Sequence, residues 1–61
     1  MPNITIGLVS GNTVEKKREL VAKITDAIVE VLKVPREIVL ITITEEGKEN
    51  IAKGGVLLSD K

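Results

Sequence analysis

One long segment of this sequence, residues 13–33, carries apolar and charged side chains on opposite faces at the spacing of an α-helix. At ~1.5 Å per residue such a helix would be about 30 Å long. Pro35 follows the segment and cannot continue the helix, because it lacks a backbone N–H and fixes φ. A helix with one apolar face needs a second surface to cover it, so the rest of the chain must provide that surface. The apolar stripe consists of Val14, Val21, Ile24, Ile28 and Val31, and Lys17 occupies the one remaining stripe position.

Two segments on either side of this helix have the patterns of β-strands. In residues 2–9, the even-numbered positions from Pro2 to Leu8 are apolar and alternate with a second set, which predicts a strand with one buried face. Residues 38–44 are apolar on both faces at their start, as in a strand that is covered on two sides. A strand, a long helix and a second strand together predict a right-handed crossover with the two strands parallel.

The last part of the chain has shorter elements. Residues 45–50 predict a polar loop, and residues 51–58 predict a short strand or hairpin arm that pairs elsewhere in the assembly. Gly54 and Gly55 interrupt this arm. We therefore expect residues 1–61 to form a single domain of the α/β (α+β) class, with one β-α-β unit and a C-terminal hairpin.

A chain of 61 residues cannot bury much surface by itself. A domain of this size buries only about 60% of the surface that its unfolded chain exposes. The sequence has no Cys and no His, so disulfides and the usual zinc or copper ligands are not available to stabilise it. We predict a homo-oligomer, in which the first strands of two copies pair antiparallel to give a four-stranded sheet with both helices on one face. The other face is expected to be apolar and to stack such dimers further.

The composition also excludes several classes of function. The formal net charge is zero and there are no aromatic residues, which disfavours binding to nucleic acid. No apolar run approaches the ~20 residues of a membrane span, and the start lacks a charged region before an apolar core, so we expect a cytosolic protein without a membrane partner. Without His or Cys the familiar Ser-His and Cys-His nucleophiles cannot form, and no phosphate-binding loop is present. We expect no cofactor and no metal. Acid-base chemistry would have to come from Lys, Glu, Asp, hydroxyl groups or the amino terminus.

Several short features match one known family in their order and spacing. The matching features are Met1-Pro2, Gly11 after the first strand, the long helix, Pro35, Ile43-Thr44-Glu45 and Gly54-Gly55. With these features the sequence resembles the 4-oxalocrotonate tautomerase family over essentially its whole length. The resemblance implies the β-α-β unit with a C-terminal hairpin that is described above, assembled as hexamers that are built from dimers.

The resemblance implies a specific chemistry for Pro2. In the family Met1 is removed, and the freed proline nitrogen moves a proton between carbon and oxygen of a small enol or dienol acid such as a 2-hydroxy-dienoate, in the breakdown of aromatic compounds. An α-amino group titrates near pH ~8, and an apolar pocket or a nearby cation favours its neutral form. A base whose pKa lies near the working pH makes proton transfer efficient.

Three positions depart from the family pattern. Its best-characterised members carry arginines at the places of Asn12 and Leu40 and an aromatic residue at the place of Ile51. Asn12 can donate a hydrogen bond to a substrate but brings no charge. The alternative is that Asn12 caps the helix, with Glu15 at the spacing of a capping box, although Thr13 can also be the cap. The missing arginines favour weak activity on diacids, or a substrate with one carboxylate or none.

Lys17 is the predicted replacement for the missing cations, because its stripe position has no other local explanation. The alternative is that its methylene stem covers apolar surface while its ammonium group reaches solvent. The first strand places the start of the helix some 25 Å from Pro2 at ~3.3 Å per residue, so Lys17 and Pro2 of one subunit cannot meet. In the antiparallel dimer, Leu8, Asn12 and Lys17 of the partner subunit would reach Pro2. We therefore predict an active site that is shared between subunits, with Pro2 as base and with Leu8, Asn12, Lys17 and Ile51 as substrate-binding residues.

Other assignments remain open at this point. Arg36 could serve a neighbouring dimer, and Glu45 and Glu46 are expected to be loop carboxylates. Two further functions fit the same scaffold. One is a structural or binding oligomer without catalysis, and the other is a hydratase or dehalogenase that uses the same amine.

Overall fold

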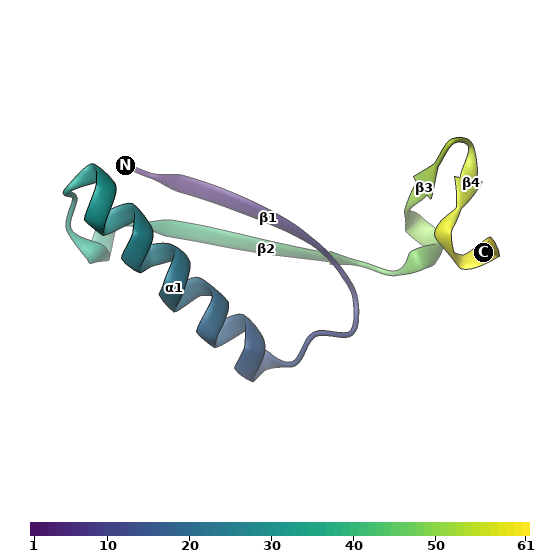
Figure 1. Ribbon diagram of the computed structural model, residues 1–61, viewed down its shortest axis with the longest axis horizontal. Helices are drawn as coiled ribbons and strands as arrows, with labels where there is room; N and C mark the ends of the chain where they lie inside the picture. Colours follow the sequence, from purple (N-terminus) through teal and green to yellow (C-terminus); the bar gives the residue numbers. More distant parts are fainter.

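The computed structural model describes residues Met1–Lys61 as a helix packed on a two-stranded sheet, with a small hairpin beyond it (Figure 1). The chain is elongated, with extents of 44 × 24 × 14 Å. None of its helices has the length and apolarity that a membrane span requires. The elements are β1 (Asn3–Val9), α1 (Val14–Leu32), η1 (Arg36–Ile38), β2 (Leu40–Glu46), η2 (Lys48–Asn50), β3 (Ala52–Lys53), β4 (Val56–Leu57) and η3 (Leu58–Asp60).

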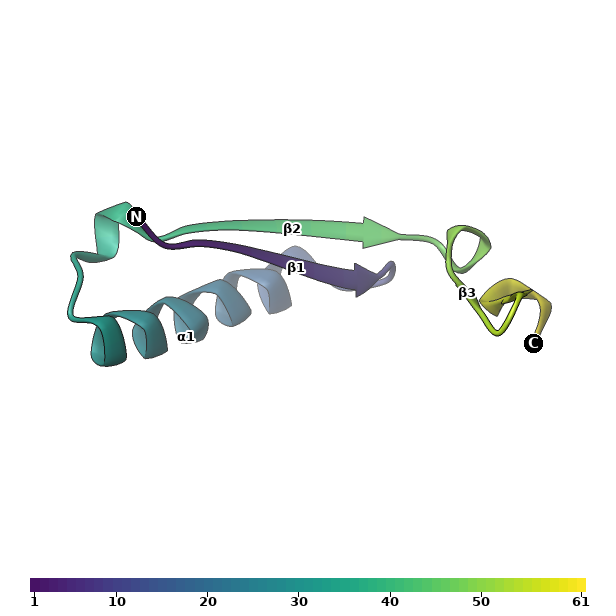
Figure 2. The same cartoon turned by 90° about the horizontal axis from the view of Figure 1, so that it is seen from above.

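β1 and β2 run parallel, which confirms the predicted crossover unit. Their register pairs Asn3 with Leu40 at one end and Val9 with Glu46 at the other. Figure 2 shows α1 lying along one face of this pair, while the opposite face is open. The even-numbered residues of β1 and the odd-numbered residues of β2 are half-buried under the helix, and their neighbours along each strand are exposed. Even so, none of the 61 residues is fully buried in the single chain, so its apolar surface is only partly covered.

The helix begins and ends one residue inside the predicted bounds. Thr13, and not Asn12, is the N-cap, because its hydroxyl oxygen accepts a hydrogen bond from the backbone N–H of Lys16 at 3.1 Å. The expectation that Asn12 caps the helix is therefore wrong. Lys33 ends the helix in a left-handed conformation with φ of 58°, and its N–H donates to the carbonyl of Val29.

The covered face of α1 departs from the predicted stripe at both ends. Val14 and Val31 are largely exposed, while Lys17 and Ile24 are half-buried. The stripe follows a 3-4 alternation with an average period of ~3.5 residues, and a straight helix drifts by about 20° per heptad against that period. The ends of the stripe therefore turn away from the sheet.

The second strand lies two residues later than predicted. Ile38 belongs to η1, and β2 continues through Glu45 and Glu46, which the sequence analysis had assigned to a loop. The open face of the sheet also differs from the apolar surface that was expected. It carries Thr5 beside Thr42 and Gly7 beside Thr44, all of them exposed. A second layer stacked on this face would meet the hydroxyl groups of these threonines at its centre and the exposed side chains of Leu40 and Val9 toward its two ends.

The C-terminal hairpin is present as predicted. β3 and β4 pair antiparallel through Lys53 and Val56, and the turn between them uses Gly54 and Gly55 with φ of 62° and 81°. Glycine adopts these left-handed angles without steric cost, which explains the Gly-Gly pair. In both ribbon views the hairpin stands apart from α1 at the far end of β2 (Figures 1 and 2). It makes an arm that contributes little to the cover of its own sheet.

Candidate active site

Pro2 lies at the start of the sheet and is fixed there through its backbone. Its carbonyl oxygen accepts a hydrogen bond from the N–H of Leu40 at 3.0 Å. The residue itself is half-buried and belongs to the same alternating set as Ile4, whereas Met1 is 86% exposed. Met1 can therefore be removed without loss of any contact that holds Pro2. While Met1 is attached, the nitrogen of Pro2 is an amide and has no basic lone pair.

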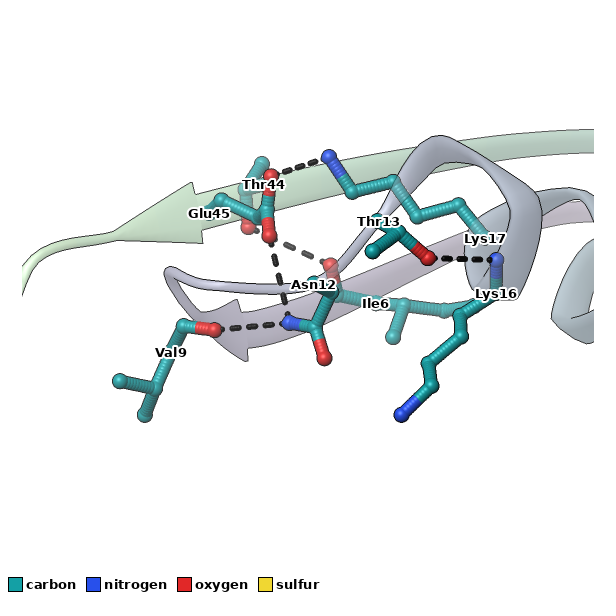
Figure 3. Close-up of polar contacts among 8 residues, drawn as sticks. All are labelled: Ile6, Val9, Asn12, Thr13, Lys16, Lys17, Thr44 and Glu45. Atoms are coloured by element: carbon teal, nitrogen blue, oxygen red, sulfur yellow. Dashed lines mark hydrogen bonds and ion pairs between the residues drawn. The ribbon is translucent and has the colours of Figure 1, made fainter.

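A second group of polar side chains lies where β1 and β2 end (Figure 3). The carboxylate of Glu45 accepts hydrogen bonds from the ammonium of Lys17 and, at 3.2 Å, from the amide nitrogen of Asn12. The same amide nitrogen donates to the carbonyl of Val9 at 2.8 Å. We call Asn12, Lys17 and Glu45 the Glu45 cluster. It ties the loop after β1, the first turns of α1 and the end of β2 to one carboxylate.

The electrostatics of the Glu45 cluster follow from these contacts. The hydrogen bond from Lys17, and then that from Asn12, lower the pKa of Glu45 below its ordinary value, so the carboxylate is ionised near neutral pH. The Lys17 and Glu45 side chains are 27% and 23% exposed and form an ion pair. In the single chain Lys17 is paired with Glu45, and its predicted role in binding substrate for a partner subunit stays a prediction. Its ammonium neither extends into solvent nor carries an unpaired charge.

Glu45 is the residue that the sequence analysis missed. A signal for it was present, because Ile41, Ile43 and Glu45 follow the alternation of β2 on the face that packs against α1. Because the predicted strand ended at Thr44, Glu45 was expected in a loop and not on the face that packs against α1. An acidic residue on a helix-covered face requires a partner, and Lys17 on the facing helix is the only cation in the stripe.

The single chain does not bring all predicted site residues together. Leu8 is the register partner of Glu45, so it lies with Asn12 and Lys17 at one end of β1. Pro2 lies at the other end, about 23 Å away for a strand of this length at ~3.3 Å per residue. Ile51 lies in the arm beyond β2, where its carbonyl accepts a hydrogen bond from Leu58 at 2.8 Å.

Two further observations bear on the chemistry available to the chain. Arg36 is paired with Asp26, which joins η1 to the last turns of α1 near the Pro2 end. No group of acidic residues is arranged to hold a metal ion, and the single chain encloses no pocket.

Comparisons with known proteins agree with the fold. The family model described as "Tautomerase enzyme" matches residues 2–61. The chain is 38% identical over 60 residues to the 2-hydroxymuconate tautomerase of Bacillus subtilis, covering 98% of this chain and 97% of the relative. It superposes on the crystal structure of YwhB, a homologue of 4-oxalocrotonate tautomerase, with a TM-score of 0.93, 37% identity and 98% of each chain covered. A heterohexameric 4-oxalocrotonate tautomerase from Chloroflexus aurantiacus gives a TM-score of 0.89 at 25% identity, with 98% of this chain and 97% of that chain covered.

The β-α-β unit with its C-terminal arm, together with the match to tautomerase homologues, defines a small enzyme of the isomerase type. The chain belongs to the tautomerase family, within the group that has the 4-oxalocrotonate tautomerase fold. Both the resemblance drawn from the sequence and the predicted fold class are thereby confirmed.

Proposed function

We propose that the chain, after removal of Met1, interconverts the enol or dienol and keto forms of a small acid such as a 2-hydroxy-dienoate, with the secondary amine of Pro2 as general base. The amine takes the proton of the enol hydroxyl while the carbonyl forms. The resulting ammonium then delivers a proton to the carbon at the other end of the conjugated system. The amine takes up one proton and gives one back, so the reaction changes neither the base nor the composition of the substrate and needs no cofactor.

The observation that carries this proposal is the way in which Pro2 is held. Its carbonyl is fixed by Leu40, so the position of the nitrogen is set by the sheet and not by Met1. An α-amino group titrates near pH ~8, and partial burial beside Ile4 disfavours its charged form. We infer that Pro2 acts in its neutral form, and a general base of this kind typically contributes about 10²–10⁴-fold to a rate.

The proposed site is shared between two copies of the chain. Only one edge of β1 is paired, with β2, and the other edge is free. Leu40 N–H bonds to Pro2 and Ser10 N–H bonds to Glu46, so in a parallel ladder the backbone groups of Thr5 and its odd-numbered neighbours point to the free edge. An antiparallel pair centred on Ile6, the middle of β1, sets Pro2 opposite Ser10 of the partner subunit. Pro2 then lies next to the partner's Glu45 cluster.

We extend this proposal to a homohexamer that is built from three such dimers and lies in the cytosol. The relative from Chloroflexus aurantiacus is a heterohexamer, and the lack of any fully buried residue here calls for extensive contacts between copies. Leu40 and Ile51 would then complete the walls of the pocket from neighbouring subunits. A pathway that breaks down aromatic compounds is the proposed setting for the reaction.

The test is the ketonisation of two enol acids, followed by ultraviolet absorbance. One is the diacid 2-hydroxymuconate, taken from the name of the Bacillus subtilis relative, and the other is the enol of phenylpyruvate. We expect Met-free protein to accelerate at least one of them and Pro2→Ala to lose about 10²-fold or more of that rate. Intact mass establishes that Met1 is absent, and sedimentation establishes that the variant keeps its assembly. Equal rates for the two proteins would remove Pro2 from the mechanism.

One observation favours a second candidate, an oligomer that binds without catalysis. The only stripe cation, Lys17, is already paired, and Asn12, Leu40 and Ile51 carry no charge. If both substrates react no faster than in buffer, the enzyme proposal fails and this candidate remains. A hydratase or dehalogenase would still depend on Pro2 but would act on other substrates.

A further inference from the structure

Glu45 occupies the centre of the only network of side chains that joins three separate segments. It lies on the helix-covered face of β2, bonded to Lys17 from α1 and to Asn12 from the loop after β1. Its neighbour Glu46 lies on the open face and is exposed. The single side-chain contact of Glu46 is a 3.4 Å bond from the amide of Asn50 in the adjoining turn. Two adjacent carboxylates of one strand therefore have opposite surroundings.

The hydrogen bonds of the Glu45 cluster leave Asn12 without a free donor. A side-chain amide nitrogen has two N–H groups. That of Asn12 serves the carbonyl of Val9 and the carboxylate of Glu45. Its oxygen points away from both partners (Figure 3) and can only accept a hydrogen bond. Asn12 in this arrangement cannot donate to a carboxylate of a substrate.

The charges of the cluster also cancel. Lys17 contributes one positive charge and Glu45 one negative charge, and the two groups are in direct contact. An additional carboxylate placed here would lose water, would meet an ammonium that already has an anionic partner, and would be repelled by that partner. An uncharged group loses much less on entering the same space.

We propose that Glu45 determines which substrates this enzyme accepts. It neutralises the Lys17 charge in the Glu45 cluster that the partner subunit brings to Pro2, so the site prefers an enol acid whose end remote from the enol and its adjacent carboxylate is uncharged. This inference rests on the proposed function and on the shared site. The preference then comes from the carboxylate of Glu45, and not only from the fact that position 12 is an asparagine and not an arginine. The diacid is accordingly the poorer substrate.

The test compares two variants that each remove one negative charge from neighbouring positions, Glu45→Gln and Glu46→Gln. For wild type we expect kcat/KM to be about tenfold or more higher for the enol of phenylpyruvate than for 2-hydroxymuconate. Glu45→Gln leaves the ammonium of Lys17 without its anion, so this ratio should shift about tenfold toward the diacid, mainly through a lower KM. Glu46→Gln controls for the change in net charge and should leave the ratio as in wild type.

A third variant acts in the opposite direction and serves if Glu45→Gln does not assemble. Lys17→Met leaves the carboxylate of Glu45 unpaired, so the diacid should be disfavoured further. A wild type that prefers the diacid would overturn the inference, as would equal ratios in Glu45→Gln and Glu46→Gln. The same holds if Lys17→Met shifts the ratio toward the diacid. Wild type that converts neither substrate, or converts them without need of Pro2, would instead defeat the proposed function itself.

Discussion

The two ends of β1 differ in how their residues are held. Pro2, at the start, is held by one backbone hydrogen bond, whereas near the other end the Glu45 cluster joins three polar side chains by hydrogen bonds. The Pro2 end supplies a nitrogen with apolar neighbours along its strand. The other end supplies charges that are already paired. These ends have opposite requirements, because a base must remain free to take a proton while a binding surface must keep a fixed shape. The parallel crossover keeps the two ends apart in one chain, and the proposed antiparallel pair of chains would bring them together.

The largest effect is expected from a change confined to the Pro2 end. One alanine inserted between Met1 and Pro2 would leave the proline in place after processing but convert its nitrogen into an amide. The proposed base would be lost, so the rate with the better enol acid should fall by about 10²–10⁴-fold. Circular dichroism and sedimentation should match those of wild type, because Met1 makes no contact that the insertion would disturb. Activity that survives the insertion would show that the nitrogen of Pro2 is not the general base.

A smaller but still large effect is expected when the dimer is weakened, because Pro2 of one subunit is then separated from the Glu45 cluster of the other. Thr5→Pro removes one backbone N–H from the free edge of β1, where proline is tolerated within a strand, and leaves the ladder to β2 intact. The dimer should weaken, and the rate per chain should become strongly dependent on protein concentration, with a loss of about tenfold or more in dilute samples. Sedimentation over a range of concentrations measures the first effect and initial rates measure the second. A monomeric variant that keeps full activity at every dilution would contradict the shared site.

The smallest effect concerns the other end and its dependence on pH. Contacts with Lys17 and Asn12 lower the pKa of Glu45 in the folded chain, so the stability that they contribute is present above the ordinary glutamate pKa of about 4.3. That contribution is lost as the pH falls through the lower pKa of the folded state. The thermal midpoint of wild type should therefore drop more steeply below about pH 4.3 than that of Glu45→Gln. Glu46→Gln should follow wild type, and identical acid profiles for all three proteins would argue against a stabilising cluster.

The elements of the fold could be predicted from the sequence because their patterns are local. Period two marks β1, and a charged face opposite an apolar face marks α1, with bounds that are correct to one residue. The Gly54-Gly55 pair locates the hairpin for the same reason, since the turn itself demands left-handed angles.

The candidate site was harder to predict because its contacts join distant parts of the chain. Lys17 was recognised as unusual, but its partner lies 28 residues later in the sequence and was assigned to a loop. Asn12 satisfies the sequence rules for a helix cap equally well, and only the bond to Glu45 distinguishes its role. Val31 and Leu40 are exposed in the single chain, and no pattern within one chain specifies what surface would cover them.

The absence of any fully buried residue in the lone chain has a consequence for how the protein is made. In the proposed homo-oligomer, folding and association would be one process governed by mass action, and the newly synthesised polypeptide would gain its full stability only on meeting further copies. Diluted tenfold, the protein should unfold at a lower temperature, as an obligate assembly does and a self-sufficient domain does not.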